Sequence, residues 1–530
     1  MDTKNVIAAI SLSAAVIIFY SLFFQSDSSN DKQNLSEEQI KVEKNTDTPS
    51  LDPAVEQIKL TRSEALDESK RILFENENIK GSISLKGALI DDLEFKKFKK
   101  EKNGLENVTL FNPKNTEDGY YAETGWATTN KNIDLPNHNS IWKIVGNDRL
   151  SPNNPIKLLW TNDQGIEFQK DIIIDNKYLF KVNQTIINKS DKSYNFYPYG
   201  QIIRNKIPEI TNFFILHEGM LGVYDSGDGS ELVENNYDDI QDKKFSIEAD
   251  SGYFGITDRM WVSVILPQKN KRFKSVHDFN DKFRVNFIEV NPTEVKANSS
   301  KSNEIKFLLA AKEVRVIDNY ADELNVDKLD LVIDWGIFYW LTRPIWSLLD
   351  YLYKFCGNYG LAIILATLIV RIVLFPLSQM SFRSMSRMKK LQPEVERIKA
   401  STKDDKLKLQ KELSALYKRE GVNPLSGCVS VIPMIFLFFS LYKVLFVTLD
   451  SYHKEFYGWI IDLSAPDPLL ITNLFGLIPW NPPAFFAIGC WPVLMGLSMA
   501  ATQALSPKMP DPVQRKIFAF FPVFLTFILA

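Results

Sequence analysis

An apolar segment that contains a single arginine constrains this chain more than any other feature. Residues 359–377 are apolar and long enough to cross a bilayer, which takes about 20 residues. Arg371 lies inside this segment, with no acidic residue within one helical turn of it. Because arginine keeps its proton in proteins, it costs about 2.5–3.5 kcal/mol at the bilayer centre on insertion scales. The segment therefore predicts a membrane-spanning helix whose cation meets water, a partner or a lipid phosphate.

Two interpretations of Arg371 stay open on this argument. The arginine lies six residues from Leu377, so its side chain can reach the headgroups by snorkelling. Alternatively, it lines a water-accessible site within the membrane. Thr367 lies one turn before Arg371 on the same helical face, which gives the helix a narrow polar stripe.

The charges of the chain are distributed unevenly. Residues 1–334 hold 42 Lys and Arg against 53 Asp and Glu, whereas residues 335–530 hold 20 against 12. A length of 530 residues indicates several domains. The three cysteines all lie in the second half, so the first half has no disulfide framework. The four histidines are scattered, and we expect no metal site and no cofactor.

The first half predicts an anchor, a linker and a large β domain. Residues 1–24 include the apolar run Val6–Phe24, which we interpret as an uncleaved transmembrane anchor. Residues 25–59 are polar and read as a disordered linker. Residues 60–334 contain period-two alternation typical of half-buried strands, which predicts a large β-sandwich domain. The alternation is seen at Tyr178, Phe180 and Val182, at Phe283, Val285 and Phe287, and at Ile305, Phe307 and Leu309.

Little in this β domain points to catalysis. The stretch Asp225–Ser230 resembles a calcium loop, but Asn236 stands where such a loop needs its glutamate, so we interpret the stretch as a turn. His217 and Glu218 are adjacent and fit a strand edge better than a catalytic pair. Paired carboxylates for glycoside hydrolysis remain open, because their separation is spatial. We expect no catalytic residue.

The second half predicts a helical core, residues 357–530, preceded by an interfacial amphipathic helix at 335–356 that is rich in Trp and Tyr. Residues 379–424 carry excess Lys and Arg, which places this loop in the cytoplasm and the β domain on the opposite side. Apolar residues recur there every three or four positions, which predicts an antiparallel helical hairpin.

The two apolar stripes of this hairpin either bury each other or meet lipid headgroups, a nascent chain or a ribosome. Bases and acids alternate along it, so we expect no specific nucleic-acid binding. The candidate contact residues of the hairpin are Arg383, Met385, Arg387, Met388, Lys389, Lys390 and Pro393.

Further spans are expected at 425–447, at 484–505 and from 517 onward, with 469–480 at the interface. Ser498 and Thr502 lie one turn apart on one face of the span at 484–505. The last apolar run ends at Ala530 and is short for a crossing, so we expect that the sequence is truncated.

Several motifs in order resemble the YidC family of membrane protein insertases. They are residues 371–378 (RIVLFPLS), 385–393 (MSRMKKLQP), 416–428 (LYKREGVNPLSGC), 463–468 (LSAPDP) and 503–508 (QALSPK). The match is densest over 359–530, and the order of anchor, β domain and helical core extends it over the whole chain.

The resemblance implies an insertase of the bacterial inner membrane that helps nascent membrane proteins insert and fold. It implies a hydrophilic groove, open to the cytoplasm and to lipid, at Arg371 and Thr367; we add Ser498 and Thr502 as candidate groove residues. The implied partners are nascent chains, the Sec translocon, the ribosome and the lipid bilayer. The resemblance also implies that the β domain is an all-β supersandwich that lies in the periplasm. The alternatives are a membrane-anchored periplasmic carbohydrate-binding protein or enzyme, and a transporter.

Two features depart from the family pattern. The family has a Gln-x-Pro pattern in its third span, where this chain has Met434-Ile-Phe436, so that wall of the groove is expected to be less polar. A sixth span and a basic C-terminal tail, which the resemblance also implies, are absent from the sequence.

Overall fold

A computed structural model describes residues 60–530 of this protein, apart from 211–215, 228, 403–404, 422–430, 476, 481, 484–485, 506–511 and 529–530. The chain divides into two compact units. The β unit takes the described residues up to 94 together with 109–259 and 263–309, and the helical unit takes 95–108, 260–262 and 310–530. The predicted anchor and linker, residues 1–59, lie outside the described residues.

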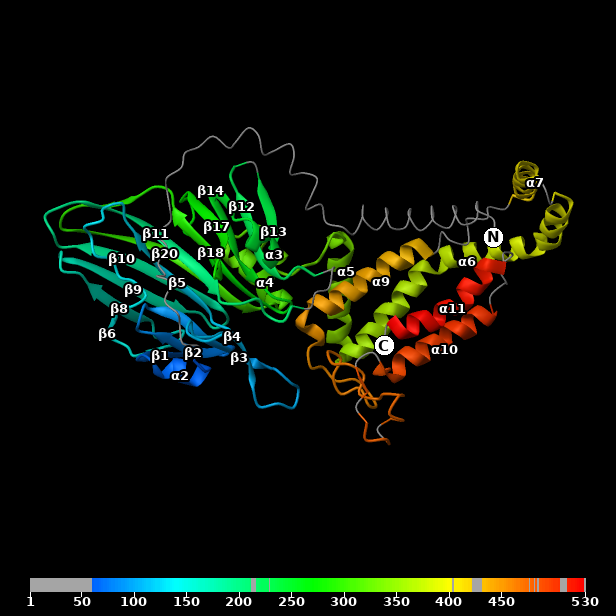
Figure 1. Ribbon diagram of the computed structural model, residues 1–530, viewed down its shortest axis with the longest axis horizontal. Coiled ribbons are helices and arrows are strands. Elements are labelled where there is room, and N and C mark those ends of the chain that lie inside the picture. Colours follow the sequence, from blue (N-terminus) through cyan, green and yellow to red (C-terminus); the bar gives the residue numbers. More distant parts are fainter. Residues whose placement is uncertain are drawn as a thin grey trace. The chain divides into compact units, whose positions relative to one another are not determined.

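Two large sheets form the β-rich part of the chain (Figure 1). The eleven-stranded sheet has the order β14 (Phe245–Ala249), β17 (Phe273–Asn280), β18 (Lys282–Glu289), β11 (Tyr194–Arg204), β5 (Tyr120–Ala127), β3 (Leu89–Lys99), β2 (Ile79–Ser84), β1 (Arg71–Glu75) and β7 (Arg149–Leu150), with β19 (Thr293–Val295) on β11 and β4 (Asn107–Phe111) on β3. The nine-stranded sheet has the order β13 (Ser230–Asn236), β12 (Gly219–Asp225), β15 (Ser251–Thr257), β16 (Trp261–Leu266), β20 (Ser299–Ala311), β10 (Leu179–Asn188), β9 (Ile166–Ile174), β8 (Ile156–Thr161) and β6 (Lys143–Val145). Two short helices, α2 (Arg62–Asp67) and α3 (Tyr237–Asp242), accompany them.

The core of the β unit lies between the two sheets, where aromatic side chains from opposite sheets meet. Phe74 of β1 contacts Phe180 of β10 edge to face, with ring centroids 5.2 Å apart. Phe168 of β9 meets Phe196 of β11 in the same way at 5.8 Å. Burial alternates residue by residue along β9, β10 and β18, as a strand with one face on the core requires. The prediction of a large β-rich domain is confirmed.

The acidic stretch Asp225–Ser230 and the neighbours His217 and Glu218 lie in and beside a β-hairpin. β12 and β13 pair antiparallel from Gly219–Asn236 to Asp225–Ser230, so the acidic stretch connects two strands, as predicted. His217 and Glu218 directly precede β12 and lie half-buried. The His217 ring contacts Asn236 and the Met220 carbonyl, and Glu218 accepts a hydrogen bond from the Arg259 backbone at 3.0 Å.

The helical unit contains α4 (Val314–Leu324), η2 (Leu329–Val332), α5 (Tyr339–Cys356), α6 (Tyr359–Ser401), α7 (Lys406–Arg419), α9 (Val431–Val447), η3 (Leu449–Ser451), α10 (Cys490–Leu505) and α11 (Pro512–Ile528). Helix α5 packs against α6 and α9, and α10 packs against α11 (Figure 1). Gly357 and Asn358 separate Cys356 from Tyr359. The left-handed backbone of Gly357 (φ 71°) ends α5 and permits the turn into α6.

Helix α6 differs from the expected arrangement. The sequence predicted a span followed by a separate hairpin helix, but both belong to one helix of 43 residues that passes through Pro376 and Pro393. Its second part still pairs with α7, because Arg419 bridges Glu394 at 3.0 Å. Among the described residues, Tyr359–Met388 is the stretch long and apolar enough to cross a membrane, and three shorter apolar helices lie at Ile432–Val447, Cys490–Leu505 and Phe518–Phe527.

A buried polar cluster joins the two sheets of the β unit. His277 of β17 is fully buried, and its Nε2 lies 2.8 Å from the Tyr224 hydroxyl of β12. The Asn235 amide lies 3.3 Å from Nδ1, and Ser275 lies 3.0 Å from the Tyr224 hydroxyl. With a neutral ring, Nδ1 accepts from Asn235 and Nε2–H donates to Tyr224, so the cluster is satisfied. Burial lowers the pKa of His277 to about 3.

This burial predicts an acid-sensitive β unit. The unfolded chain protonates His277 near its ordinary pKa of 6.5, whereas the folded chain resists protonation down to about 3. Stability therefore falls as the pH drops below 6.5, by up to about 1.4 kcal/mol per pH unit from this group. The melting temperature of the β unit, followed by calorimetry of the full chain in detergent from pH 7.5 to 4.5, should fall less steeply in His277→Gln than in the wild type.

The result is the difference between the wild type and His277→Gln in how steeply the melting temperature falls with pH. Burial raises the pKa of Asp91 to about 6 although Arg71 pairs with it, so Asp91 contributes in the opposite sense in both proteins. His217→Gln, at a half-buried position, is the matched control and should keep the wild-type slope. Equal slopes in wild type and His277→Gln would contradict the prediction.

Candidate functional site: a cavity beside Arg371

A small cavity lies between α5, α6 and α9, and Arg371 lines it. Its volume is about 30 Å³, enough for about two water molecules. The other lining residues are Ile345 and Leu348 of α5, Ala366, Thr367 and Val370 of α6, and Met434, Leu437, Phe438 and Leu441 of α9. Arg371 and Thr367 are therefore the polar members of an otherwise apolar wall.

Arg371 is the charged residue among those that line the cavity. The side chain is exposed, and it makes no ion pair with any residue that the structure describes. Tyr359 begins α6 twelve residues earlier, which corresponds to about 18 Å of helix. A charge at this depth in a hydrocarbon layer of about 30 Å needs water or an opposite charge.

The predicted groove residues do not all meet at this cavity. Thr367 does, and its hydroxyl donates to the Ile363 carbonyl of its own helix at 2.8 Å. Ser498 and Thr502 are exposed on α10 and are not among the residues that line the cavity. The Thr502 hydroxyl donates to the Ser498 carbonyl at 2.8 Å. A groove role for these two residues stays a prediction.

The hairpin contact residues all lie on the second part of α6. Arg383, Arg387, Lys390 and Pro393 are exposed and Met388 is half-buried, whereas the side chains of Met385 and Lys389 are not among those described. Their contacts with a nascent chain, lipid or a ribosome stay a prediction.

Sequence reasoning missed a buried ion pair in the helical unit. Lys443 of α9 has a side chain only 2% exposed, and its Nζ lies 2.7 Å from Asp334 Oδ2. Asp334 precedes α5, so the pair ties the start of α5 to the helix that carries Met434 and Phe438. A lysine inside an apolar helix signals a required acid, but its partner stands 109 residues away.

Aromatic and charged side chains around Arg343 fix the position of α5. The Arg343 guanidinium lies over the rings of Trp335 and Trp346, at 4.7 Å and 5.2 Å from their centroids, and bridges Asp318 of α4 at 2.7 Å. The Trp346 indole donates to Asp450 at 2.6 Å. Cation–π contacts of this kind contribute about 0.5–2 kcal/mol each. The predicted interfacial helix is thus fixed by side-chain contacts along its length.

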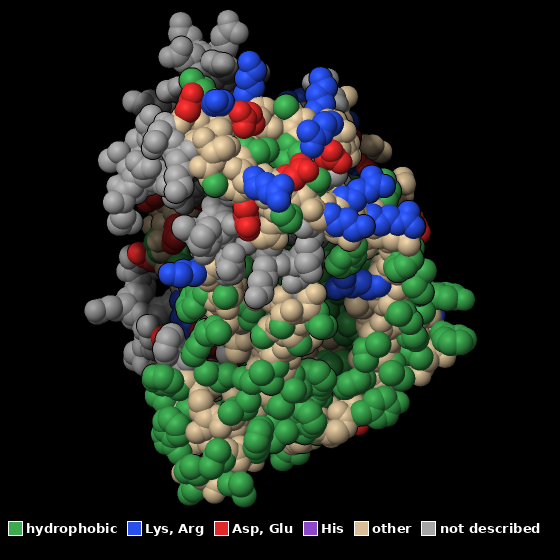
Figure 2. Space-filling view, turned by 90° about the vertical axis from the view of Figure 1, so that its right-hand side faces the viewer, with side chains coloured by type: hydrophobic (Ala, Val, Ile, Leu, Met, Phe, Trp, Pro, Cys, Tyr) green, Lys and Arg blue, Asp and Glu red, His purple; other side chains and the backbone are tan. Residues whose placement is uncertain are grey.

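The surface of the helical unit is largely apolar. Large exposed hydrophobic residues occur on several of its helices, among them Ile364, Leu368, Ile372, Val373 and Phe375 on α6, Ile432, Ile435 and Phe438 on α9, Trp491, Leu494 and Leu497 on α10, and Phe518, Phe520, Phe521 and Phe524 on α11. Figure 2 shows hydrophobic side chains covering much of one face, with Lys and Arg gathered at its upper end. Apolar patches of this extent mark contact with a membrane or another protein.

These features define a class of protein: a membrane protein with a large β-sandwich domain and a helical core that holds an arginine beside a small cavity. Residues 71–348 match the family model described as YidC periplasmic domain, and residues 351–530 match the one described as 60Kd inner membrane protein. The chain belongs to the YidC family of membrane protein insertases, a family of insertases and not of enzymes. The resemblance seen in the sequence motifs is confirmed.

Full-length relatives agree with this assignment. Membrane protein insertase YidC of Pelagibacter ubique (strain HTCC1062) is 56% identical over 530 residues, covering 100% of this chain and 94% of the relative. The protein of the same name from Rickettsia massiliae (strain Mtu5) is 39% identical over 538 residues, covering 99% and 94%. A crystal structure described as an active YidC insertase with the first transmembrane domain resolved is 18% identical, covers 90% of this chain and 89% of that one, and superposes with a TM-score of 0.35.

The buried ion pair predicts a specific pattern of stability. Removing one partner leaves a buried charge unpaired, which costs about 3–5 kcal/mol, whereas replacing both by apolar residues costs much less. We expect Lys443→Met and Asp334→Asn each to lower the temperature at which the detergent-solubilised protein loses its monodisperse elution peak. The double variant Lys443→Met with Asp334→Leu should recover most of that loss.

The matched control is Lys354→Met. Lys354 pairs with Asp350 at 3.2 Å, but its side chain is 56% exposed, and exposed pairs contribute about 0–1 kcal/mol. Its elution profile should stay close to that of the wild type. A double variant that is less stable than both single variants would refute the account of the pair.

Proposed function

We propose that this protein inserts nascent membrane proteins into the lipid bilayer, and that Arg371 and its cavity form the site where a polar part of the substrate is received. The observation that carries the proposal is an exposed arginine, without an ion-pair partner among the described residues, on the helix that is long and apolar enough to span a membrane. Membership of the insertase family supports the same function.

Attraction to Arg371 can offset the cost of moving a charged substrate group into the bilayer. A carboxylate or other charge moved to the bilayer centre costs about 2.5–3.5 kcal/mol on insertion scales. A guanidinium and a carboxylate 4 Å apart attract by about 4 kcal/mol at an effective dielectric constant of 20. A substrate acid that meets Arg371 part-way across therefore has most of its cost offset. The cavity has room for about two water molecules, which would hydrate both charges when they meet.

Release into lipid follows from the rest of the surface. The residues beside Arg371 on α6, among them Leu368, Ile372 and Val373, are exposed and apolar. A substrate helix can therefore leave the polar site sideways and exchange these contacts for lipid at little cost, because both are hydrocarbon. No bond breaks in this process, so it requires no catalytic residue and no cofactor. Ser498 and Thr502 would add hydroxyl groups to the same path.

The topology that fits this function has the β domain in the periplasm and the second part of α6 with α7 in the cytoplasm. The exposed basic residues Arg383, Arg387 and Lys390 support this orientation, because cytoplasmic loops carry the excess of Lys and Arg. Nascent chains, the ribosome, the Sec translocon and anionic lipid headgroups are the partners we propose for this face. A transporter would need paired ionisable groups at the membrane midplane, and Arg371 has no such partner among the described residues.

The proposal predicts that insertion depends on the charge at position 371. We expect Arg371→Ala to lose most activity, at least about tenfold, and Arg371→Lys to keep part of it, because a lysine restores the charge without the guanidinium geometry. The measurement is insertion of a small single-span substrate with an acidic translocated segment into liposomes that contain the purified protein.

A substrate without acidic residues in its translocated segment tests the cause. Its insertion should depend less on Arg371 than that of the acidic substrate. Arg397→Ala, an exposed arginine further along α6, is the matched control and should insert both substrates normally. Full activity of Arg371→Ala with the acidic substrate would exclude the charge from the mechanism.

A further inference from the structure

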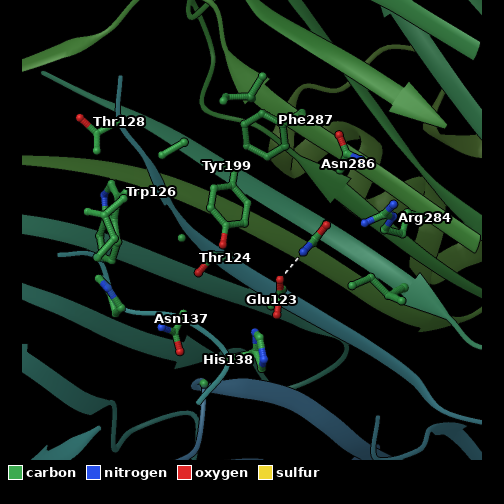
Figure 3. A pocket seen from close by; sticks show the side chains of 18 of the residues that line it. Glu123, Thr124, Trp126, Thr128, Asn137, His138, Tyr199, Arg284, Asn286 and Phe287 are labelled. Carbon is green, nitrogen blue, oxygen red and sulfur yellow. Dashed lines mark hydrogen bonds between the residues drawn. The ribbon is translucent and has the colours of Figure 1, made fainter. Parts of the chain in front are cut away.

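The β unit contains a second, larger cavity that the proposed insertion site does not use. Its volume is about 390 Å³, within the range of about 300–1,000 Å³ of small-molecule sites. Strands β5, β11 and β18 supply one side, and the irregular segment 128–142 supplies another. Figure 3 shows Asn137 and His138 of that segment across from Tyr199 and Asn286, with Glu123 between them.

The strand register brings a row of polar side chains to this cavity. Gln201 of β11 pairs with Glu123 of β5 on one side and with Asn286 of β18 on the other. Because directly paired residues point to the same face of a sheet, the carboxylate and the two amides form a continuous row. Gln201 donates to Glu123, the dashed line in Figure 3. Carboxylates and amides in a row offer alternating acceptors and donors, the pattern that neighbouring hydroxyl groups match.

Two buried polar atoms at the cavity lack a partner among the described residues. Trp142 is only 2% exposed, yet its indole N–H has no acceptor in the described part of the chain. The Asn286 Oδ1 atom is buried and has no donor there either. Buried polar groups are almost always hydrogen-bonded, and leaving one unsatisfied costs about 1–3 kcal/mol. Both residues line the cavity, so a bound molecule there can satisfy a donor and an acceptor at once.

A buried lysine stands beside the unsatisfied indole. Lys170 of β9 is 2% exposed, and its ammonium lies 4.9 Å from the Trp142 ring centroid. Its one described hydrogen bond goes to the Thr124 carbonyl at 2.7 Å, although an ammonium has three donors. Burial lowers the pKa of Lys170 to about 8, against the effect of Glu123. An anion at this place would stabilise the charged form.

The balance of charge around the cavity also favours an anion. Five cationic residues line it, Lys114, Lys131, Lys170, Lys244 and Arg284, against two acids, Glu123 and Asp278. Arg284 and Asp278 pair with each other at 3.2 Å. The remaining surplus is positive, and a concave site lined with one sign of charge concentrates ligands of the opposite sign.

We propose that this cavity binds a small polyhydroxy acid, a compound of monosaccharide size that carries one carboxylate. Lys170 and the Trp142 indole hold the carboxylate, and the row Glu123, Gln201 and Asn286 holds the hydroxyl groups. The aromatic rings of Tyr199 and Trp126 border the same space and supply apolar faces for the carbon skeleton. The site lies wholly within the β unit and does not depend on the insertion mechanism at Arg371.

Calorimetric titration of the full-length protein in detergent tests the proposal. The probes are galacturonate, glucuronate and gluconate, compared with neutral galactose and glucose and with acetate. We expect at least one of the three hydroxy acids to bind at micromolar to low millimolar concentration, and the neutral sugars and acetate to bind at least about tenfold more weakly, since each lacks one of the two recognised groups.

Three variants assign the binding to the cavity. Lys170→Met keeps an unbranched side chain, one heavy atom shorter, and removes the charge, so the hydroxy acid should bind at least about tenfold more weakly. Trp142→Phe keeps an aromatic ring, removes the unsatisfied N–H and should weaken binding several-fold without unfolding the domain. Lys143→Met, at an exposed neighbouring position outside the cavity, should bind as the wild type does.

The proposal is overturned if none of the three hydroxy acids binds, if acetate or the neutral sugars bind as tightly, or if Trp142→Phe and Lys170→Met, both folded by circular dichroism, bind like the wild type. Stronger binding of an acidic peptide than of any hydroxy acid would also overturn it. Insertion activity should be unchanged in both cavity variants. Failure of this binding site and failure of the insertion site are therefore separate outcomes.

Discussion

A charged side chain in apolar surroundings must have an opposite charge, a hydrogen-bond partner or water, and this requirement organises the helical unit. Two cations on its apolar helices meet the requirement in opposite ways. Lys443 is buried, and Asp334 at 2.7 Å balances its charge inside the protein. Arg371 is exposed beside a cavity and has no ion-pair partner among the described residues. The first cation depends on its partner to remain buried, and we propose that the second meets a polar part of the substrate.

The same requirement explains the polar groups buried in the β unit. His277 is accommodated as a neutral ring, because Asn235 and Tyr224 satisfy its two nitrogen atoms. Lys170 is only partly accommodated. It makes one described hydrogen bond, and the N–H of the neighbouring Trp142 has no acceptor among the residues that the structure describes. The satisfied cluster joins two sheets and has a structural role. The incompletely satisfied group lines a cavity, and it is there that a ligand is expected.

Much of the fold was predictable where a local pattern repeats. The alternation at Phe283, Val285 and Phe287 marks a strand, because period two matches the pleat and one face must be buried. The apolar length around Arg371 marks a spanning helix for a similarly local reason. The join between that helix and its cytoplasmic continuation was not predictable. The sequence predicted a span and a separate hairpin, but one helix runs from Tyr359 to Ser401 and passes through Pro376 and Pro393 without ending.

The sequence by itself determined that this chain has a β-rich domain, an apolar helical part and an unneutralised arginine, since periodicity, composition and the absence of nearby acids are local properties. Only the tertiary structure decided which distant groups meet. The pairing of Lys443 with Asp334 spans 109 residues, and the row Glu123, Gln201 and Asn286 exists only once three strands adopt one register. Such contacts arise when the burial of many side chains fixes the chain in one arrangement, and no local pattern encodes their partners.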